Sequence, residues 1–388
     1  MPNRFSSLSH DSPTLATIDL AALAHNLTVA RQSIPASCEI LAVVKADAYG
    51  HGAVAVSKRL AQLGVSRFGV ATIQEGITLR EAGIQGPILV MGALFPDQLP
   101  DLLAAGLTPV VHDPAIADRL ASLARSRPEP YPVHIKVDTG MGRLGLAPDQ
   151  VLSLLQSPSF KGPLKADALM THLADADGPD PDYTRIQIAR FQSVVGQVEA
   201  AGLSVPFFHA ANSAAILRHP SAHFNMVRPG LMLYGYQSLP ADTAASSNLA
   251  DHKPALLTPI LTLSTRVVQI RNLGQGESIS YNRTYRTSRP SRIAILPIGY
   301  ADGYSRLLSN RGQVLIKGSR VGIVGRVCMD MTMVDVTCLP TAAVGDEVVL
   351  IGRQGEAQIS AAEVAAWTDT IPYEVLCAIG PRVPRVYR

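Results

Sequence analysis

The chain has 388 residues, of which 47% are hydrophobic and 17% are charged, and its formal net charge is only +3. A chain of this length and composition can form two domains and bury a substantial core. The small net charge, with no run of five or six like charges, gives no support to a nucleic-acid-binding or membrane-surface function.

The cysteines and the N-terminus indicate the compartment. The chain has 4 cysteines, and none of them forms a C-x-x-C pair of the kind found in zinc ribbons and redox sites. Scattered cysteines are typical of a reducing compartment. Residues 1–13 are polar and lack the apolar stretch of a signal peptide, and no run of about 18 apolar residues predicts a membrane span. We therefore expect a soluble, cytoplasmic protein.

Short β-rich runs alternate with helical patterns from residue 41 onward. The expected strands are residues 41–44, 68–71, 88–91, 108–112, 133–138, 168–172, 207–210 and 224–228. Helical spacing is clear in residues 53–63 and 183–200. Strands that alternate with helices in this way predict a parallel α/β fold, and eight such units predict a (β/α)8 barrel of the TIM type.

The composition changes after a linker at residues 237–254, which is rich in Ala, Ser, Asp and Pro. The β-rich segments that follow are residues 260–270, 292–296, 314–324, 333–336 and 347–351, with one expected helix at 360–368. Few helical patterns separate these segments, which predicts a second, mostly-β domain. We place the barrel domain at residues 14–240 and the C-terminal β domain at 255–388, with residues near 1–18 packing on the latter.

Polar residues gather where the predicted barrel would be active, at the C-terminal ends of its strands. These residues are Lys45 after the first strand, His134, Lys136 and Asp138 on the fifth, His172 on the sixth, Asn212 and Ser213 after the seventh, and Arg228 on the eighth. The alternate spacing of His134, Lys136 and Asp138 places them on one face, which we expect to point into the barrel. Buried charges are costly unless they are paired, so this cluster predicts a functional site.

Each of these residues also has an ordinary structural interpretation. A lysine after a strand is usually exposed to solvent. Lys136 and Asp138 could neutralise each other, His172 could be a hydrogen-bonded core residue, and Arg228 could lie at a surface turn. Their concentration at one end of the barrel favours the functional interpretation.

One string resembles a dinucleotide-binding fingerprint, namely Gly140-x-Gly142-x-x-Gly145. That fingerprint requires a helix that begins at once and contains the last glycine. Here Pro148 is expected to start the helix, so all three glycines would lie in a loop. We therefore expect no dinucleotide site.

Residues 43–52 (VVKADAYGHG) resemble the cofactor-lysine signature of alanine racemases. Further motifs resemble those of the same family in the same order: residues 136–145 (KVDTGMGRLG), 170–172 (MTH), 211–213 (ANS), 227–230 (VRPG), 280–281 (SY), 297–303 (PIGYADG), 325–330 (GRVCMD) and 373–375 (YEV). The resemblance extends over the chain from about residue 14. One departure is Asp47, which stands where many relatives have Asn.

The resemblance implies an isomerase that uses pyridoxal 5′-phosphate to interconvert L- and D-alanine. Lys45 would carry the cofactor and act as one base, and Tyr281, from another subunit, would be the second. The residues implied for cofactor binding are Lys45, Tyr49, Asn212, Ser213, Arg228 at the pyridine nitrogen, Gly230, Leu231 and Tyr373. Those implied for the substrate are Arg143, Met329 and Tyr300, and the supporting residues are Lys136, often carbamylated in the family, His172, Arg228 and Asp330.

The residue types suit racemisation, because two bases on opposite faces of the Cα atom can remove and return a proton in place. Both would need lowered pKa values, since the unperturbed values are about 10.4 for lysine and about 10 for tyrosine. The family implies a homodimer with shared active sites and without a metal ion. Such an enzyme supplies D-alanine for peptidoglycan or takes part in alanine catabolism.

Other functions are compatible with parts of the pattern. A broader racemase of serine and alanine would use the same residues. A metal-dependent barrel hydrolase could use His112, His134, Lys136, His172 and His209, but strand one lacks a His-x-His pair and strand eight ends in arginine. A non-catalytic cofactor carrier would lack the β domain, and a decarboxylase of basic amino acids would need a cysteine and acidic groups for its larger substrate.

Overall fold

The computed structural model describes residues 12–237 and 257–388. The chain forms two compact units. The barrel unit comprises the described residues of Ala24–Ala48 and Ala53–Thr258, and the β unit those of Met1–Leu23, Tyr49–Gly52 and Pro259–Arg388. Apart from Gln237, the predicted linker at 237–254 lies outside the described residues, as do residues 1–11.

The barrel unit contains an 8-stranded parallel sheet in the order β8-β7-β6-β5-β4-β3-β2-β9. Its strands are β2 (Glu39–Val43), β3 (Arg67–Val70), β4 (Ile88–Val90), β5 (Thr108–Val111), β6 (Tyr131–Lys136), β7 (Leu164–Met170), β8 (Phe207–His209) and β9 (Met226–Val227). The first strand, β2, pairs with the last, β9, so the sheet nearly closes on itself. The predicted (β/α)8 barrel is confirmed, and each of the eight predicted strands overlaps an observed one.

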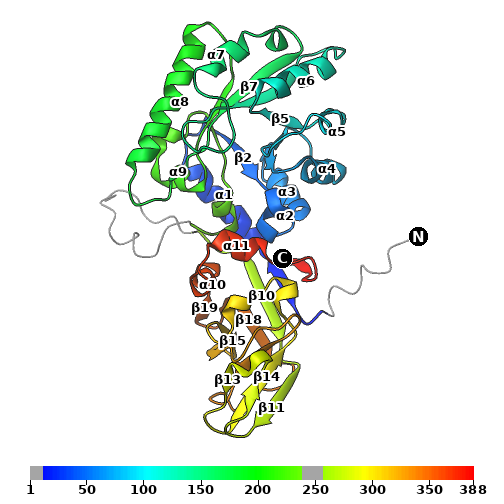
Figure 1. Cartoon of the computed structure of the whole chain (residues 1–388), viewed down its shortest axis with the longest axis vertical. Helices are drawn as coiled ribbons and strands as arrows, with labels where there is room; N and C mark the ends of the chain where they lie inside the picture. Colours follow the sequence, from blue (N-terminus) through cyan, green and yellow to red (C-terminus); the bar gives the residue numbers. More distant parts are fainter. Residues whose placement is uncertain (1–11, 238–256) are drawn as a thin grey trace, which may run out of the picture. The chain divides into compact units, whose positions relative to one another are not determined.

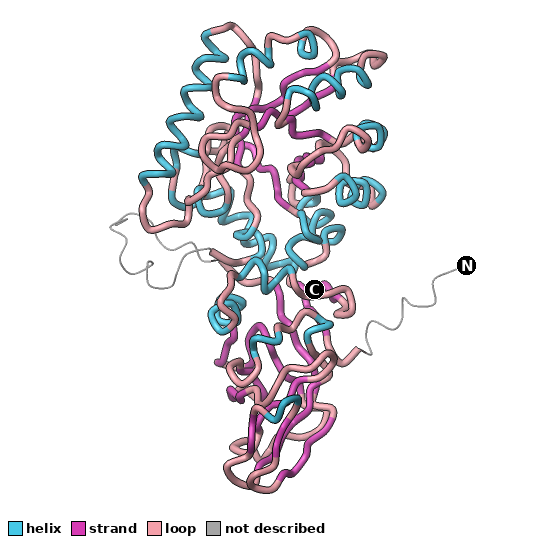
Figure 2. Tube along the Cα trace, in the orientation of Figure 1, coloured by secondary structure: helices cyan, strands magenta, loops and turns pink. Residues whose placement is uncertain are grey.

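Helices alternate with these strands and lie around the sheet (Figures 1 and 2). In chain order the α-helices are α1 (Leu20–Gln32), α2 (Lys45–Gly50), α3 (Ala53–Gln62), α4 (Ile73–Glu81), α5 (Leu99–Ala104), α6 (Pro114–Ala124), α7 (Gln150–Leu155), α8 (Asp182–Ala200) and α9 (Ser213–Arg218). The buried residues of α8 recur every three or four positions, from Thr184 to Val198, so one face of this helix packs on the core. A 3-10 turn, η4 (Leu231–Tyr234), follows β9.

The β unit contains three sheets. The largest has the order β16-β15-β18-β10-β1-β20 with β19 paired to β18, and the smaller ones are β11-β14-β17 and β12-β13. The strands are β1 (Leu15–Ile18), β10 (Leu261–Arg266), β11 (Gln269–Leu273), β12 (Ser278–Ile279), β13 (Tyr285–Arg286), β14 (Ser291–Leu296), β15 (Gln313–Ile316), β16 (Ser319–Gly322), β17 (Thr332–Asp335), β18 (Glu347–Gln354), β19 (Ala357–Ile359) and β20 (Arg385–Tyr387). The predicted mostly-β C-terminal fold is confirmed.

Two of the predicted β-rich segments are each divided into two strands. Residues 260–270 form β10 and β11, because the N–H of Val267 bonds to Asp346 whereas the N–H of Val268 bonds to Ile295 in another sheet. Residues 314–324 form the β15–β16 hairpin, whose turn has positive φ at Lys317 (49°) and Gly318 (75°).

The remaining elements of the β unit are short. They are the 3-10 turns η6 (Tyr281–Arg283), η7 (Tyr300–Asp302) and η8 (Arg306–Leu308) and the helices α10 (Ala361–Trp367) and α11 (Pro372–Cys377). The helix predicted at 360–368 is α10, which begins where the Ser360 side chain accepts a hydrogen bond from the N–H of Glu363.

Candidate active site

Lys45 begins α2, two residues after the end of β2, and the backbone that follows it is left-handed. Residues 46–49 have φ between 52° and 55° although none of them is glycine. Such a conformation costs roughly 1–2 kcal/mol per residue, so neighbouring groups must hold it in place. One carboxylate oxygen of Glu75 accepts the N–H of Ala46 at 2.7 Å, and the other accepts the N–H of Ala71 at 2.7 Å.

The departure from the family pattern at Asp47 has a local structural explanation. The Asp47 side chain accepts the N–H of Ala53 at 2.7 Å, and Ala53 is the first residue of α3. An asparagine oxygen could accept the same bond, since Asp and Asn serve equally well at helix N-termini. The Asp47 side chain therefore provides the same local contact that an asparagine would provide.

Arg228, which follows β9, is 4% exposed, so it is not the surface turn residue of the alternative interpretation. Its Nη1 donates to Nδ1 of His209 at 2.8 Å and to the His209 carbonyl at 2.9 Å. Its Nη2 donates to the carbonyls of Thr171 at 2.8 Å and Ala210 at 3.0 Å, and lies 3.3 Å from His172 Nδ1. Burial lowers the pKa of Arg228 to about 10, so the side chain stays cationic at neutral pH.

His172 follows β7 by two residues, and its Nδ1 contacts the same Arg228 nitrogen, Nη2, that donates to the Thr171 and Ala210 carbonyls. Burial, and then the positive charge of Arg228, lowers the pKa of His172 to about 3. The charges of Lys136, Arg143 and Lys45 act in the same direction. His172 is therefore neutral and accepts at Nδ1, which leaves its proton on Nε2.

Lys136 ends β6 and is 5% exposed. Burial, together with the positive charges of Arg143 and Arg228, lowers its pKa to about 8. Asp138 is not engaged mainly with Lys136: its Oδ1 accepts the N–H groups of Gly140 and Met141, both at 2.9 Å. Although burial opposes the change, these backbone bonds lower the pKa of Asp138.

The loop after β6 explains why the dinucleotide-like string has no helix at its end. Gly140, Gly142 and Gly145 have φ of 134°, 69° and 135°, and α7 begins only at Gln150. These φ values favour glycine and are not helical. The loop prediction is confirmed, and the helix begins two residues after Pro148.

The ends of β8 and β9 meet at Ser213, the first residue of α9. Its Oγ accepts the N–H of Gly230 at 3.0 Å and the N–H of Met232 at 3.2 Å. The Ser213 hydroxyl proton therefore remains available as a donor. The preceding residue, Asn212, uses its side-chain oxygen to cap α9 by accepting the N–H of Ala215 at 3.0 Å.

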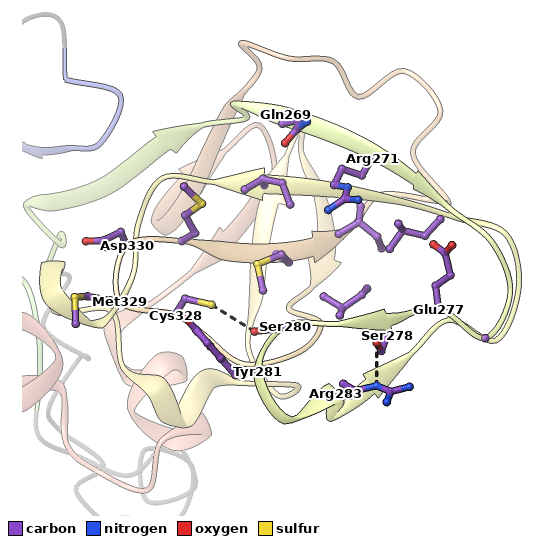
Figure 3. Close-up of a pocket in the computed structure, with 17 residues that line it drawn as sticks. Gln269, Arg271, Glu277, Ser278, Ser280, Tyr281, Arg283, Cys328, Met329 and Asp330 are labelled. Atoms are coloured by element: carbon purple, nitrogen blue, oxygen red, sulfur yellow. Dashed lines mark hydrogen bonds between the residues drawn. The ribbon is translucent and has the colours of Figure 1, made fainter.

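In the β unit, Tyr281, Met329 and Asp330 line one basin of about 1050 Å³, shown in Figure 3. Tyr281 is 69% exposed, and the residues on either side of it have positive φ: 63° at Ser280 and 59° at Asn282. Ser280 is held by a 2.8 Å bond from its Oγ to the Arg326 carbonyl. This strained turn presents the phenol to the basin.

Three predicted residues of the β unit, Tyr49, Tyr300 and Tyr373, are not part of the lining of that basin. Tyr300 is instead part of the lining of a second cavity of about 480 Å³. The rings of Tyr49 and Tyr373 lie 5.9 Å apart, and burial raises the pKa of Tyr49. Asp330 forms a 2.8 Å ion pair with Arg382.

Two family models match the chain: alanine racemase, N-terminal domain, over residues 18–238, and alanine racemase, C-terminal domain, over residues 260–387. The chain belongs to the alanine racemase family. It is 44% identical over 376 residues to the alanine racemase of Halothermothrix orenii, with 97% of each chain covered. Its activity is alanine racemisation, an isomerase reaction, and the predicted family, fold and reaction are confirmed.

Solved structures of other alanine racemases have the same fold. The racemase is 37% identical to the enzyme of Bacillus anthracis with bound L-Ala-P, with a TM-score of 0.88 and coverage of 97% and 95% of the two chains. It is 31% identical to the enzyme of Bartonella henselae with covalently bound pyridoxal phosphate, with a TM-score of 0.85 and coverage of 97% and 100%.

Sequence reasoning overlooked two residues that shape the racemase site. Glu75 holds the turn after Lys45, but its only sequence signal is a capping box with Thr72 at the start of α4. His209 holds Arg228 and entered the prediction only as a possible metal ligand.

Within the described ranges, no group of three His, Cys, Asp or Glu side chains is placed to hold a metal ion. In the same ranges, no helix is long and apolar enough to span a membrane.

Proposed function

We propose that the racemase binds pyridoxal 5′-phosphate on Lys45 and transfers the Cα proton of alanine between Lys45 and Tyr281. The observation that carries this proposal is the environment of Arg228, a buried cation whose Nη atoms donate to His209, Thr171 and Ala210. Within the described residues all its hydrogen bonds use Nη1 or Nη2, which leaves Nε as its donor for a ligand. The covalently bound cofactor of the Bartonella henselae relative supports the assignment.

The barrel unit offers partners for both ends of the cofactor, the ring nitrogen and the phosphate. Arg228 would donate to the ring nitrogen and, because it remains cationic, keep that nitrogen unprotonated. Ser213, Gly230 and Leu231 would hold the phosphate, and Asn212 would support them by capping α9. The family resemblance implies phosphate contacts for Tyr49 and Tyr373 as well. When bound, the cofactor supplies the electron sink that makes the Cα proton acidic.

Lys45 would serve the face from which the D-alanine proton leaves, and Tyr281 the opposite face. The positive charge of Lys45 is one of the lesser causes of the lowered pKa of Lys136. His172 would contribute to the acidity of Tyr281, since its Nε2 proton can be donated to a phenolate oxygen. Asp330, which also lines the basin, would be a supporting residue.

Arg143 and Met329 would bind the substrate carboxylate, and Tyr300 would contribute to substrate binding. Lys136 would orient Arg143 after carbamylation, in which its neutral amine adds to CO2 and releases one proton. The lowered pKa of Lys136, about 8, supplies neutral amine near physiological pH. The product is an anion, which can pair with the Arg143 guanidinium.

The exposure of Tyr281 supports a homodimer with shared sites. Met329 and Met331 beside it are also about half exposed, at 52% and 49%. Large apolar side chains grouped on a surface are typical of interaction sites. We propose that the barrel of one protomer and the Tyr281 basin of its partner form each site. The barrel domain at 14–240 would hold the cofactor, and the β domain at 255–388 would supply Tyr281.

Alanine is the substrate of the confirmed activity, and a broader racemase of serine and alanine stays the alternative. A cytoplasmic location and a role in peptidoglycan precursor supply or alanine catabolism stay predictions.

The proposed role of Lys45 is tested by an absorbance scan combined with a chiral assay. Wild-type protein should show the visible band of lysine-bound cofactor and convert L- to D-alanine, and Lys45→Ala should lose both. A wild-type protein without that band, even after added cofactor, would refute the proposal.

A further inference from the structure

A line of buried polar side chains leads away from Arg228 through the barrel unit. Beyond the Arg228–His209 bond, Nε2 of His209 lies 3.0 Å from Nδ1 of His134, on β6. Nε2 of His134 lies 3.6 Å from the Asp167 carboxylate, on β7. The two histidines are 0% and 1% exposed, whereas the Asp167 side chain is 19% exposed. The line therefore begins at the proposed cofactor site and ends near the surface.

The line contains two hydrogen bonds, Arg228–His209 and His209–His134, and their direction follows from Arg228. Burial lowers the pKa of both His209 and His134, so each ring carries one proton. Arginine has only donors, so His209 must accept at Nδ1 and carry its proton on Nε2. His134 must then accept at Nδ1 and carry its own proton on Nε2, which faces the Asp167 carboxylate.

Asp167 matches this arrangement because an ionised carboxylate only accepts. The His134 ring is the main cause of a lowered pKa at Asp167, which keeps the carboxylate charged. If both histidines changed tautomer, a proton on His209 Nδ1 would face the N–H of Arg228. Asp167 favours the tautomers that avoid this clash of donors.

We propose that Asp167 and His134 are positioning residues that fix the tautomer of His209 and thereby the orientation of Arg228. The inference rests on the proposed contact between Arg228 and the cofactor ring. The competing explanation is that Asp167 acts only as a structural ion pair. Arg67 Nη1 lies 3.4 Å from the same Asp167 oxygen, and its guanidinium stacks on Phe207 at 4.3 Å.

The first measurement needs no cofactor. Long-range 1H–15N spectra of the full-length protein, recorded with and without pyridoxal phosphate, report which imidazole nitrogen is protonated. His134→Gln and His209→Gln assign the two signals. We expect both rings to be neutral with the proton on Nε2. A proton on Nδ1 of His209, or a cationic His134 at neutral pH, would overturn the proposal.

The second measurement separates hydrogen bonding from charge. Asp167→Ala removes the acceptor and the ion pair, whereas Asp167→Asn removes the charge but keeps an acceptor oxygen. For Asp167→Ala we expect loss of the single Nε2–H form of His134 and an affinity for pyridoxal phosphate about tenfold weaker, the size of one lost buried hydrogen bond. Asp167→Asn should retain the tautomer and most of the affinity.

If Asp167→Ala and Asp167→Asn changed the His134 tautomer and the affinity for pyridoxal phosphate equally, Asp167 would be only a structural ion pair. That result would overturn the proposal. Asp182→Ala, which removes an exposed ion pair with Arg185, is the matched control and should change neither the imidazole spectra nor the affinity. If wild-type protein does not bind pyridoxal phosphate, the proposed cofactor fails, but the imidazole spectra of the cofactor-free protein still decide the tautomers.

Discussion

Nη2 of Arg228 lies 3.3 Å from Nδ1 of His172 in the barrel unit, where Arg228 is buried and His172 is partly buried. The contact joins a residue that stays cationic to one that stays neutral. It therefore fixes one donor and one acceptor at the proposed cofactor site before any ligand enters.

Replacing Arg228 should change the fate of the substrate as well as the rate. In Arg228→Glu, an acidic group would favour a protonated ring nitrogen, which spreads charge into the cofactor and permits transamination. We expect racemisation to fall about 10²- to 10³-fold and pyruvate to form at a larger fraction of turnovers. A coupled pyruvate assay beside the chiral assay measures both. Arg228→Lys, which keeps the cation, is the control, and unchanged product purity in Arg228→Glu would contradict the prediction.

Removing Tyr281 should affect the two enantiomers unequally. Tyr281→Ala lacks the base on the L side, so proton abstraction from L-alanine should slow about 10²- to 10⁴-fold, the usual contribution of a general base. Exchange of the D-alanine proton should be retained to a larger extent, because Lys45 serves that face. Deuterium uptake from D2O into each enantiomer, followed by NMR, is the measurement. Tyr285→Phe, at a residue outside the basin lining, is the control. Equal slowing of exchange from L-alanine and D-alanine in Tyr281→Ala would refute the two-base assignment.

The stability of the racemase should depend on pH through Lys136. Its pKa falls from 10.5 in its ordinary state to about 8 when folded, because of burial. Between these values the unfolded chain binds more protons at this residue than the folded chain, so the contribution of Lys136 to stability rises with pH across that window. In CO2-free buffer, urea unfolding of wild type relative to Lys136→Met should therefore shift in favour of the wild type as pH rises from 8. Bicarbonate should reduce this dependence if Lys136 is carbamylated, and parallel pH profiles in CO2-free buffer would contradict the lowered pKa.

Glu75 should be needed for the left-handed turn that follows Lys45. Each of its two oxygens accepts a different N–H, from Ala46 and Ala71, and glutamine can supply only one such oxygen. Glu75→Gln should therefore cost about 1–3 kcal/mol of stability and lower kcat, while Glu75→Leu should do more of both. Thermal unfolding and steady-state kinetics measure the two effects. Glu81→Gln, exposed at the end of the same helix, should leave both unchanged.

Local patterns in the sequence were enough to predict the barrel. Its strands are short apolar runs separated by amphipathic helices, so each element can be recognised from the spacing of its own residues. The loop from Asp138 to Gly145 was predictable in the same way, since three closely spaced glycines before Pro148 do not continue a helix. The motifs around Lys45, Arg228 and Tyr281 identified the family, because their order along the chain is specific.

Tertiary structure alone decided what surrounds these residues. Ala16 in β1 pairs with β10 and with Arg385 of β20, so its strand exists only because segments from both ends of the chain meet. The left-handed turn after Lys45 opposes local preference and depends on Glu75, 29 positions away. The line from Arg228 through His209 and His134 joins side chains on separate strands. Sequence spacing records periodicity within one element, whereas hydrogen-bond partners and burial arise when distant elements pack together.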